Sequence, residues 1–124
     1  MQGFEMGLGR LRSRSTDEIS EQLHQFVDAV KSLPDVSAVI LFGSAARGQL
    51  TDASDIDLAV LISDVCDQKA IKSKLNEHRK AHISWPVDLV IMKRSWFEQQ
   101  KSFGGLCMDI DADAKWLYSK ESGG

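Results

Sequence analysis

The sequence of 124 residues has few cysteines and no long hydrophobic run. Its two cysteines, Cys66 and Cys107, stand far apart without a CxxC pair, which excludes a disulfide framework and the spacing of a zinc site. The longest nearly apolar runs, Val36 to Phe42 and Leu58 to Ile62, are far shorter than the ~18 to 20 residues that span a bilayer. We therefore expect no transmembrane helix and no membrane partner.

Targeting and nucleotide-binding signatures are also missing. Arg10, Arg12 and Arg14 are not followed by the apolar stretch that a secretory signal requires, so we expect a cytoplasmic protein. No Walker A sequence is present, which excludes the phosphate-binding loop of P-loop proteins.

The composition that remains is that of one ordinary globular domain, with 43% hydrophobic and 27% charged residues and a net charge of −3. The charges are segregated along the chain. The stretch from Asp35 to Asp67 is rich in aspartate and contains a single basic residue, Arg47, whereas residues 68–101 are mainly basic. Clustered aspartates repel one another unless cations bind among them, while the basic stretch is consistent with a solvated helix face.

Hydrophobic spacing predicts alternating helices and strands. Ser15 and Glu18 have the spacing of a capping box, which predicts a helix from about Thr16 to Leu33 that ends before Pro34. We expect a flexible segment over 1–14, a folded domain over 15–119 and a tail over 120–124. The expected elements that follow are strands at 36–42, 55–62, 87–92 and 115–118, a short helix after Gly43, and helices at 67–81 and 95–103. This order predicts an α/β or α+β fold with a small sheet.

Three carboxylates occupy unusual positions in these strands. Asp55 and Asp57 are two residues apart in an apolar strand, so alternation directs both to one face, and Asp88 is the second residue of another apolar strand. If the two strands are neighbours, the three carboxylates form an oxygen site suited to Mg²⁺ or Mn²⁺. The alternative is that Asp55 and Asp57 merely begin a strand at the solvent edge. The later aspartates Asp109, Asp111 and Asp113 lack the glycine and glutamate of a calcium loop and are expected in a solvated loop.

The turn before these carboxylates has features of a phosphate site. Gly43 and Ser44 end one strand and open a helix, which offers backbone N–H groups, a hydroxyl and the positive end of a helix dipole. Arg47, one turn later, adds a charge that can bind phosphate oxygens. The alternatives are an ordinary turn for Gly43 and Ser44 and a surface ion pair with a neighbouring aspartate for Arg47.

Together, the segments Leu41-Phe42-Gly43-Ser44-Ala45-Ala46-Arg47-Gly48 and Ser54-Asp55-Ile56-Asp57-Leu58 resemble the signature of DNA polymerase β-type nucleotidyltransferases. The length is similar to that of the minimal members of this superfamily, some of which are antitoxins. The resemblance implies a small mixed sheet flanked by helices, a nucleoside triphosphate donor, most simply ATP, and two Mg²⁺ ions. It implies that Asp55 and Asp57 hold both ions and that Asp88 completes one metal shell and helps to deprotonate the acceptor. Gly43 and Ser44, with Arg47, would hold the triphosphate.

The function expected from this resemblance is transfer of AMP to a hydroxyl of a partner protein, such as a tyrosine of a HEPN-type toxin. The negative net charge, and the absence of aromatic residues among the basic ones, favour a protein acceptor over RNA. Two alternatives stay open. One is a non-catalytic binding module that neutralises a partner protein, and the other is an aminoglycoside-type nucleotidyltransferase, which would need an additional helical domain.

Overall fold

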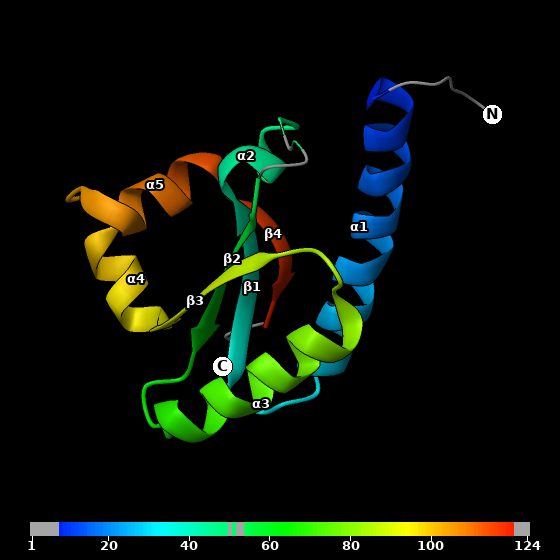
Figure 1. Cartoon of the computed structure of the whole chain (residues 1–124). Helices are drawn as coiled ribbons and strands as arrows, with labels where there is room; N and C mark the ends of the chain where they lie inside the picture. The colour runs from blue at the N-terminus through cyan, green and yellow to red at the C-terminus, as the bar shows by residue number, and fades with distance from the viewer. Residues whose placement is uncertain (1–7, 50, 52–53, 121–124) are drawn as a thin grey trace.

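The structure, a computed structural model, describes residues 8–49, 51 and 54–120, with side chains from residue 18 onward. Helices and strands alternate along most of the chain (Figure 1). In chain order the elements are α1 (Leu8–Val30), β1 (Val36–Phe42), α2 (Gly43–Ala46), β2 (Ile56–Ile62), α3 (Gln68–His82), β3 (Val87–Lys93), α4 (Arg94–Gln100), α5 (Gly105–Asp113) and β4 (Lys115–Ser119).

The four strands form one mixed sheet in the order β3-β2-β1-β4. The central strand β1 is antiparallel to both β2 and β4, whereas β2 and β3 are parallel. The two central strands are almost completely buried, because helices cover both faces of the sheet, and this explains why β1 and β2 read as continuous apolar runs rather than as alternating patterns. The expected α/β fold with a small mixed sheet is confirmed.

The helices cover the sheet as two layers (Figure 1). On one face, α1 and α3 pack against alternate residues of the strands, and the buried side chains of this larger core include Phe26, Val30 and Leu75. On the other face, α4 and α5 bury Phe97 and Ile110 against the strands. Side chains alternate between the two cores along each strand, so each strand position can be assigned to one helical layer.

The first helix differs from the expectation. It begins at Leu8 and ends at Val30, so the capping-box prediction at Ser15 is wrong: Ser15 lies inside the helix. Residues 8–14, which were expected to be flexible, are helical, and residues 1–7 lie outside the described residues. Leucine and arginine are strong helix formers, which accounts for the extension upstream of Ser15. Within the described part of the chain, no helix combines the length and the apolar character needed to cross a membrane.

The helix α5 is the second difference, because its aspartates Asp109, Asp111 and Asp113 were expected in a solvated loop. Cys107 and Ile110 are three residues apart and both are buried, so one face of the helix packs against the sheet. Asp109 and Asp111 lie on the exposed part of the helix. The aspartates on alternate positions concealed the helical spacing of these two apolar residues. The preceding helix, α4, correspondingly ends at Gln100 rather than at Phe103.

Candidate active site

The parallel pairing of β2 and β3 places Asp57 directly opposite Asp88. Residues matched across neighbouring strands point to the same face of the sheet. This is the face covered by α4 and α5, because Ala59, which is two residues after Asp57, and Val90, which is two residues after Asp88, belong to the core on that side. Asp57 is half-buried and Asp88 is exposed. Two carboxylates therefore lie side by side where the parallel strands begin.

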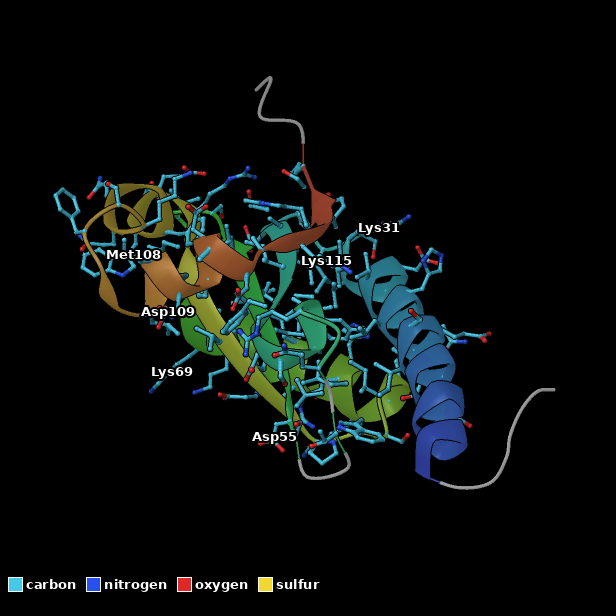
Figure 2. All side chains as sticks on the ribbon, turned by 90° about the horizontal axis from the view of Figure 1, so that it is seen from above. Lys31, Asp55, Lys69, Met108, Asp109 and Lys115 are labelled. Atoms are coloured by element: carbon cyan, nitrogen blue, oxygen red, sulfur yellow. The ribbon has the colours of Figure 1, made fainter. Side chains whose placement is uncertain are left out.

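The third carboxylate, Asp55, immediately precedes β2, because the strand begins at Ile56 and not at Asp55 as expected. Its side chain is exposed and lies at the margin of the molecule (Figure 2). The three predicted carboxylates thus come from the start of two neighbouring strands, and one of them is half-buried while two are exposed.

These charged groups act on one another. The pKa of the Asp57 carboxyl is raised, first because burial disfavours its charged form and then because Asp88 and Asp55 carry like charges, while Arg47 opposes the shift. A bound cation would therefore reduce the electrostatic repulsion between Asp57 and the other two carboxylates. Asp55, Asp57, Asp88 and Arg47 share this environment although they come from different parts of the chain.

The backbone of Gly43 lies very close to the Asp57 carboxyl. Its φ angle is +75°, in the left-handed region that favours glycine. A Cβ atom at this position would overlap Oδ2 of Asp57 and would lie 3.0 Å from its Cγ. The missing side chain therefore allows the start of α2 to pack against the Asp57 carboxyl. The sequence indicated Gly43 only as part of a phosphate-binding turn, and its contact with Asp57 was not predicted.

The N-terminal end of α2 lies at the same place. Phe42 occupies the N-cap position and makes no side-chain capping hydrogen bond there. The first amides of a helix have no acceptor within the helix, so Gly43 and Ser44 present N–H groups beside the carboxylates. The Ser44 side chain is half-buried, and its carbonyl accepts a hydrogen bond from the Gln49 amide at 2.8 Å. This arrangement is suited to phosphate oxygens.

Arg47 is engaged by α5. Its Nη1 donates to Oδ2 of Asp113 at 2.5 Å, and its Nε donates to Oε1 of Gln49 at 3.1 Å. The sequence left two alternatives for Arg47, phosphate binding and an ion pair with an aspartate, and the structure shows the ion pair. The partner comes from the helix that the sequence did not predict, so the identity of this aspartate could not have been read from local spacing.

A divalent cation is the group that these residues would hold. Carboxylate oxygens are the donors that Mg²⁺ prefers, and the mutual repulsion at Asp57 is of the kind that a cation relieves. In the described ranges, no three His, Cys, Asp or Glu side chains are gathered closely enough to form a metal-binding group. The chemistry of these oxygen donors nevertheless fits a divalent cation.

A groove of about 410 Å³ lies elsewhere, between α1 and β4. Lys31, which directly follows α1, and Lys115 from β4 line it and are labelled in Figure 2. Other lining residues, such as Leu23 and Leu41, pack in the core on the α1 side of the sheet, which is the face opposite Asp57. None of the predicted site residues lines this groove.

Comparison with known proteins assigns the family. The model of the family described as polymerase beta, nucleotidyltransferase, matches residues 24–122. The chain belongs to this family and is a nucleotidyltransferase. No curated protein sequence matches the chain.

Solved structures agree with this fold. A predicted nucleotidyltransferase from Sulfolobus solfataricus is similar at 22% identity and a TM-score of 0.61, over 95% of this chain and 96% of that chain. A toxin–antitoxin structure with AMP-PNP contains a chain with 25% identity and a TM-score of 0.52, over 86% of this chain and 74% of that chain. A mutant of the toxin–antitoxin pair MntA–HpeT is similar at 26% identity and a TM-score of 0.52, over 82% and 73% of the two chains.

The close approach of Gly43 predicts a difference between two glycines. Gly43→Ala and Gly48→Ala both place a side chain at a φ angle above +70°, which costs about 1 to 2 kcal/mol. Only the Cβ at position 43 meets Asp57, since nothing lies within 4 Å of a Cβ at position 48. We expect Gly43→Ala to lower the free energy of unfolding clearly more than Gly48→Ala in urea denaturation. Equal losses would show that the packing of Gly43 against Asp57 is unimportant.

The raised pKa of Asp57 predicts a pH-dependent effect on stability. A group whose pKa is raised by folding stabilises the protein below its unfolded pKa, about 3.9, and this contribution is lost as pH rises through the folded pKa. Without ligands, Asp57→Asn should therefore melt at a higher temperature than the wild type at pH 7, and the gap should shrink on acidification. Asp109→Asn, which changes an exposed carboxyl on α5, is the control. A wild type that melts above Asp57→Asn at pH 7 would contradict the electrostatic interpretation.

Proposed function

We propose that this nucleotidyltransferase moves AMP from ATP to a hydroxyl group of a partner protein and is the antitoxin of a toxin–antitoxin pair. The observation that carries the proposal is the register of β2 and β3, which sets Asp57 opposite Asp88, with Gly43 packed against the Asp57 carboxyl. Carboxylates beside a helix N-terminus are the equipment of nucleotidyl transfer, because the reaction needs cation ligands and a cradle for the triphosphate.

In this proposal Asp55 and Asp57 would hold two Mg²⁺ ions, and Asp88 would complete the shell of one of them. Bound Mg²⁺ would supply charge neutralisation at the phosphates and at the departing pyrophosphate. The amides of Gly43 and Ser44 and the Ser44 hydroxyl bind the phosphate oxygens, and the guanidinium of Arg47 adds charge-assisted hydrogen bonds when it leaves Asp113.

Asp88 also accepts the proton of the acceptor hydroxyl, as its exposed position permits. The acceptor oxygen attacks the α-phosphorus, and a new oxygen–phosphorus bond forms. The bond from the α-phosphorus to the bridging oxygen breaks, and pyrophosphate leaves with that electron pair. The products are an AMP ester of the acceptor and pyrophosphate.

A toxin of the HEPN type is the proposed partner. Support comes from the similarity of the chain to members of toxin–antitoxin structures, one of which contains AMP-PNP. The net charge of −3 favours a protein over RNA as acceptor. The basic residues of α3, including Lys69, Lys72 and Lys80, belong to the helical layer opposite Asp57, so they do not form the rim of the candidate active site.

The role of Arg47 can be tested because its ion pair with Asp113 can be removed separately from its guanidinium. Arg47→Ala removes the guanidinium, whereas Asp113→Ala removes the ion pair and leaves the guanidinium in place. Hydrogen bonds to charged groups contribute about 1.5 to 3 kcal/mol, so Arg47→Ala should weaken ATP–Mg²⁺ binding by about tenfold or more. Asp113→Ala should bind at least as tightly as the wild type in isothermal titration calorimetry. Equal losses in both variants would assign Arg47 a purely structural role.

Transfer to a protein is tested by co-expressing the chain with the protein encoded beside it and measuring both by intact-mass spectrometry. We expect the neighbour to gain one or more AMP groups. Asp88→Asn should slow this transfer by about 10²- to 10⁴-fold, because a general base is lost, and Asp109→Asn should not. An unmodified neighbour that forms a stable complex with the wild type and with Asp88→Asn would favour the binding-module alternative. Modification of an added aminoglycoside instead would identify a small-molecule enzyme.

A further inference from the structure

The direction of the Asp55 side chain is set by the backbone on either side of it. It lies just outside β2, and its side chain is exposed. The two peptide groups that flank it are both held by the dipeptide that precedes β3. The Trp85 indole Nε1 donates to the Ser54 carbonyl at 2.9 Å, and the Ile56 amide donates to the Pro86 carbonyl at 2.9 Å.

These two hydrogen bonds restrict both backbone torsions of Asp55. A peptide group is planar, so the chain on either side of Asp55 rotates only about φ and ψ. The Ser54 carbonyl belongs to the plane before Asp55, and the Ile56 amide belongs to the plane after it. With both planes anchored to residues 85–86, the Cα–Cβ bond of Asp55 is aimed in one direction relative to the start of β3, where Asp88 lies.

Trp85 is itself held from the other side. It is half-buried and packs against the larger core. The neighbouring Ser84 amide donates to Oε1 of Gln22 at 2.9 Å, and Nε2 of Gln22 donates to the Ser84 hydroxyl at 3.1 Å. A continuous set of contacts thus runs from α1 through residues 84–86 to the backbone on both sides of Asp55.

We propose that Trp85 is a positioning residue, whose indole N–H aims the Asp55 carboxylate at the cation shared with Asp57 and Asp88. The inference rests on the proposed function in one respect, namely that Asp55 binds a divalent cation. Trp85 would touch neither the nucleotide nor the acceptor.

The test compares Trp85→Phe with Trp96→Phe. Both variants lose an indole N–H and keep an aromatic ring, but the Trp96 side chain is exposed and lies on α4. Mn²⁺ binding in the presence of AMP-PNP is measured from the electron paramagnetic resonance signal of free Mn²⁺. Loss of one neutral hydrogen bond predicts a Kd for Mn²⁺ raised about three- to tenfold in Trp85→Phe and unchanged in Trp96→Phe. The affinity for AMP-PNP without metal should be unchanged in both.

A purely structural role gives a different result. In that case Trp85→Phe lowers the melting temperature and leaves the Kd for Mn²⁺ at the wild-type value, which overturns the inference. If Trp85→Phe does not fold, Trp85→Met decides the question, because it also removes the indole N–H and keeps an apolar side chain. A raised Kd for Mn²⁺ in Trp85→Met supports the inference, and an unchanged Kd overturns it.

The binding experiment is separable from the proposed function because it needs no acceptor. A wild type that binds Mn²⁺ with AMP-PNP but modifies no partner would contradict the proposed function and leave the role of Trp85 standing if Trp85→Phe binds Mn²⁺ more weakly. A wild type that modifies its partner while Trp85→Phe keeps full Mn²⁺ affinity would overturn the inference alone. A wild type that binds no Mn²⁺ would overturn the role of Trp85.

Discussion

The register between β2 and β3 is the constraint on which the candidate active site depends. Asp57 and Asp88 lie opposite each other only because the two strands are parallel and begin at the same edge of the sheet. The central strand β1 runs antiparallel to β2, so its C-terminal end, followed by Gly43, reaches this same edge. A mixed sheet is therefore required for the glycine–serine turn to meet the carboxylates. In a wholly parallel sheet, the end of β1 would lie at the opposite edge.

Local sequence pattern predicted the parts of this site that are local. The buried strand over 36–42 and the turn at Gly43 were visible because apolar runs and glycine punctuate the chain at short range. Asp88 was predicted from its place in an apolar strand, and its pairing with Asp57 depends on a crossover connection that no short window contains. The ion pair of Arg47 with Asp113 joins residues 66 positions apart, so no short-range spacing could reveal it.

The same limit explains why the support of Asp55 was not predicted. A tryptophan in a sequence most simply predicts a core residue. The hydrogen bond from the Trp85 indole to the Ser54 carbonyl joins residues that are 31 positions apart. The α5 helix was missed for another reason, since its alternating aspartates give it almost no amphipathic pattern although Cys107 and Ile110 are buried. Hydrophobic periodicity identifies a helix from several apolar residues that recur on one face. A short helix with only two buried residues has too few of them to be recognised.

The charge pattern of the site opposes the stability of the ligand-free protein. Burial and two like charges raise the pKa of Asp57, so folding disfavours the ionised form of this carboxyl relative to the unfolded chain. Residues kept at a functional site commonly reduce stability in this way. A bound cation would favour the ionised carboxylates, because their attraction to the ion outweighs their mutual repulsion.

Arg47 connects this electrostatic balance to α5. In the structure its charge is paired with Asp113 across a partly exposed contact, and ion pairs of this kind contribute only about 0 to 1 kcal/mol. Hydrogen bonds from a guanidinium to phosphate oxygens are charge-assisted and roughly twice as strong as neutral ones. In the proposed function, a triphosphate takes the place of Asp113 at Arg47. When Arg47 leaves, Asp113 at the end of α5 loses its partner, so nucleotide binding is expected to change the electrostatic environment of this helix as well as that of the strand ends.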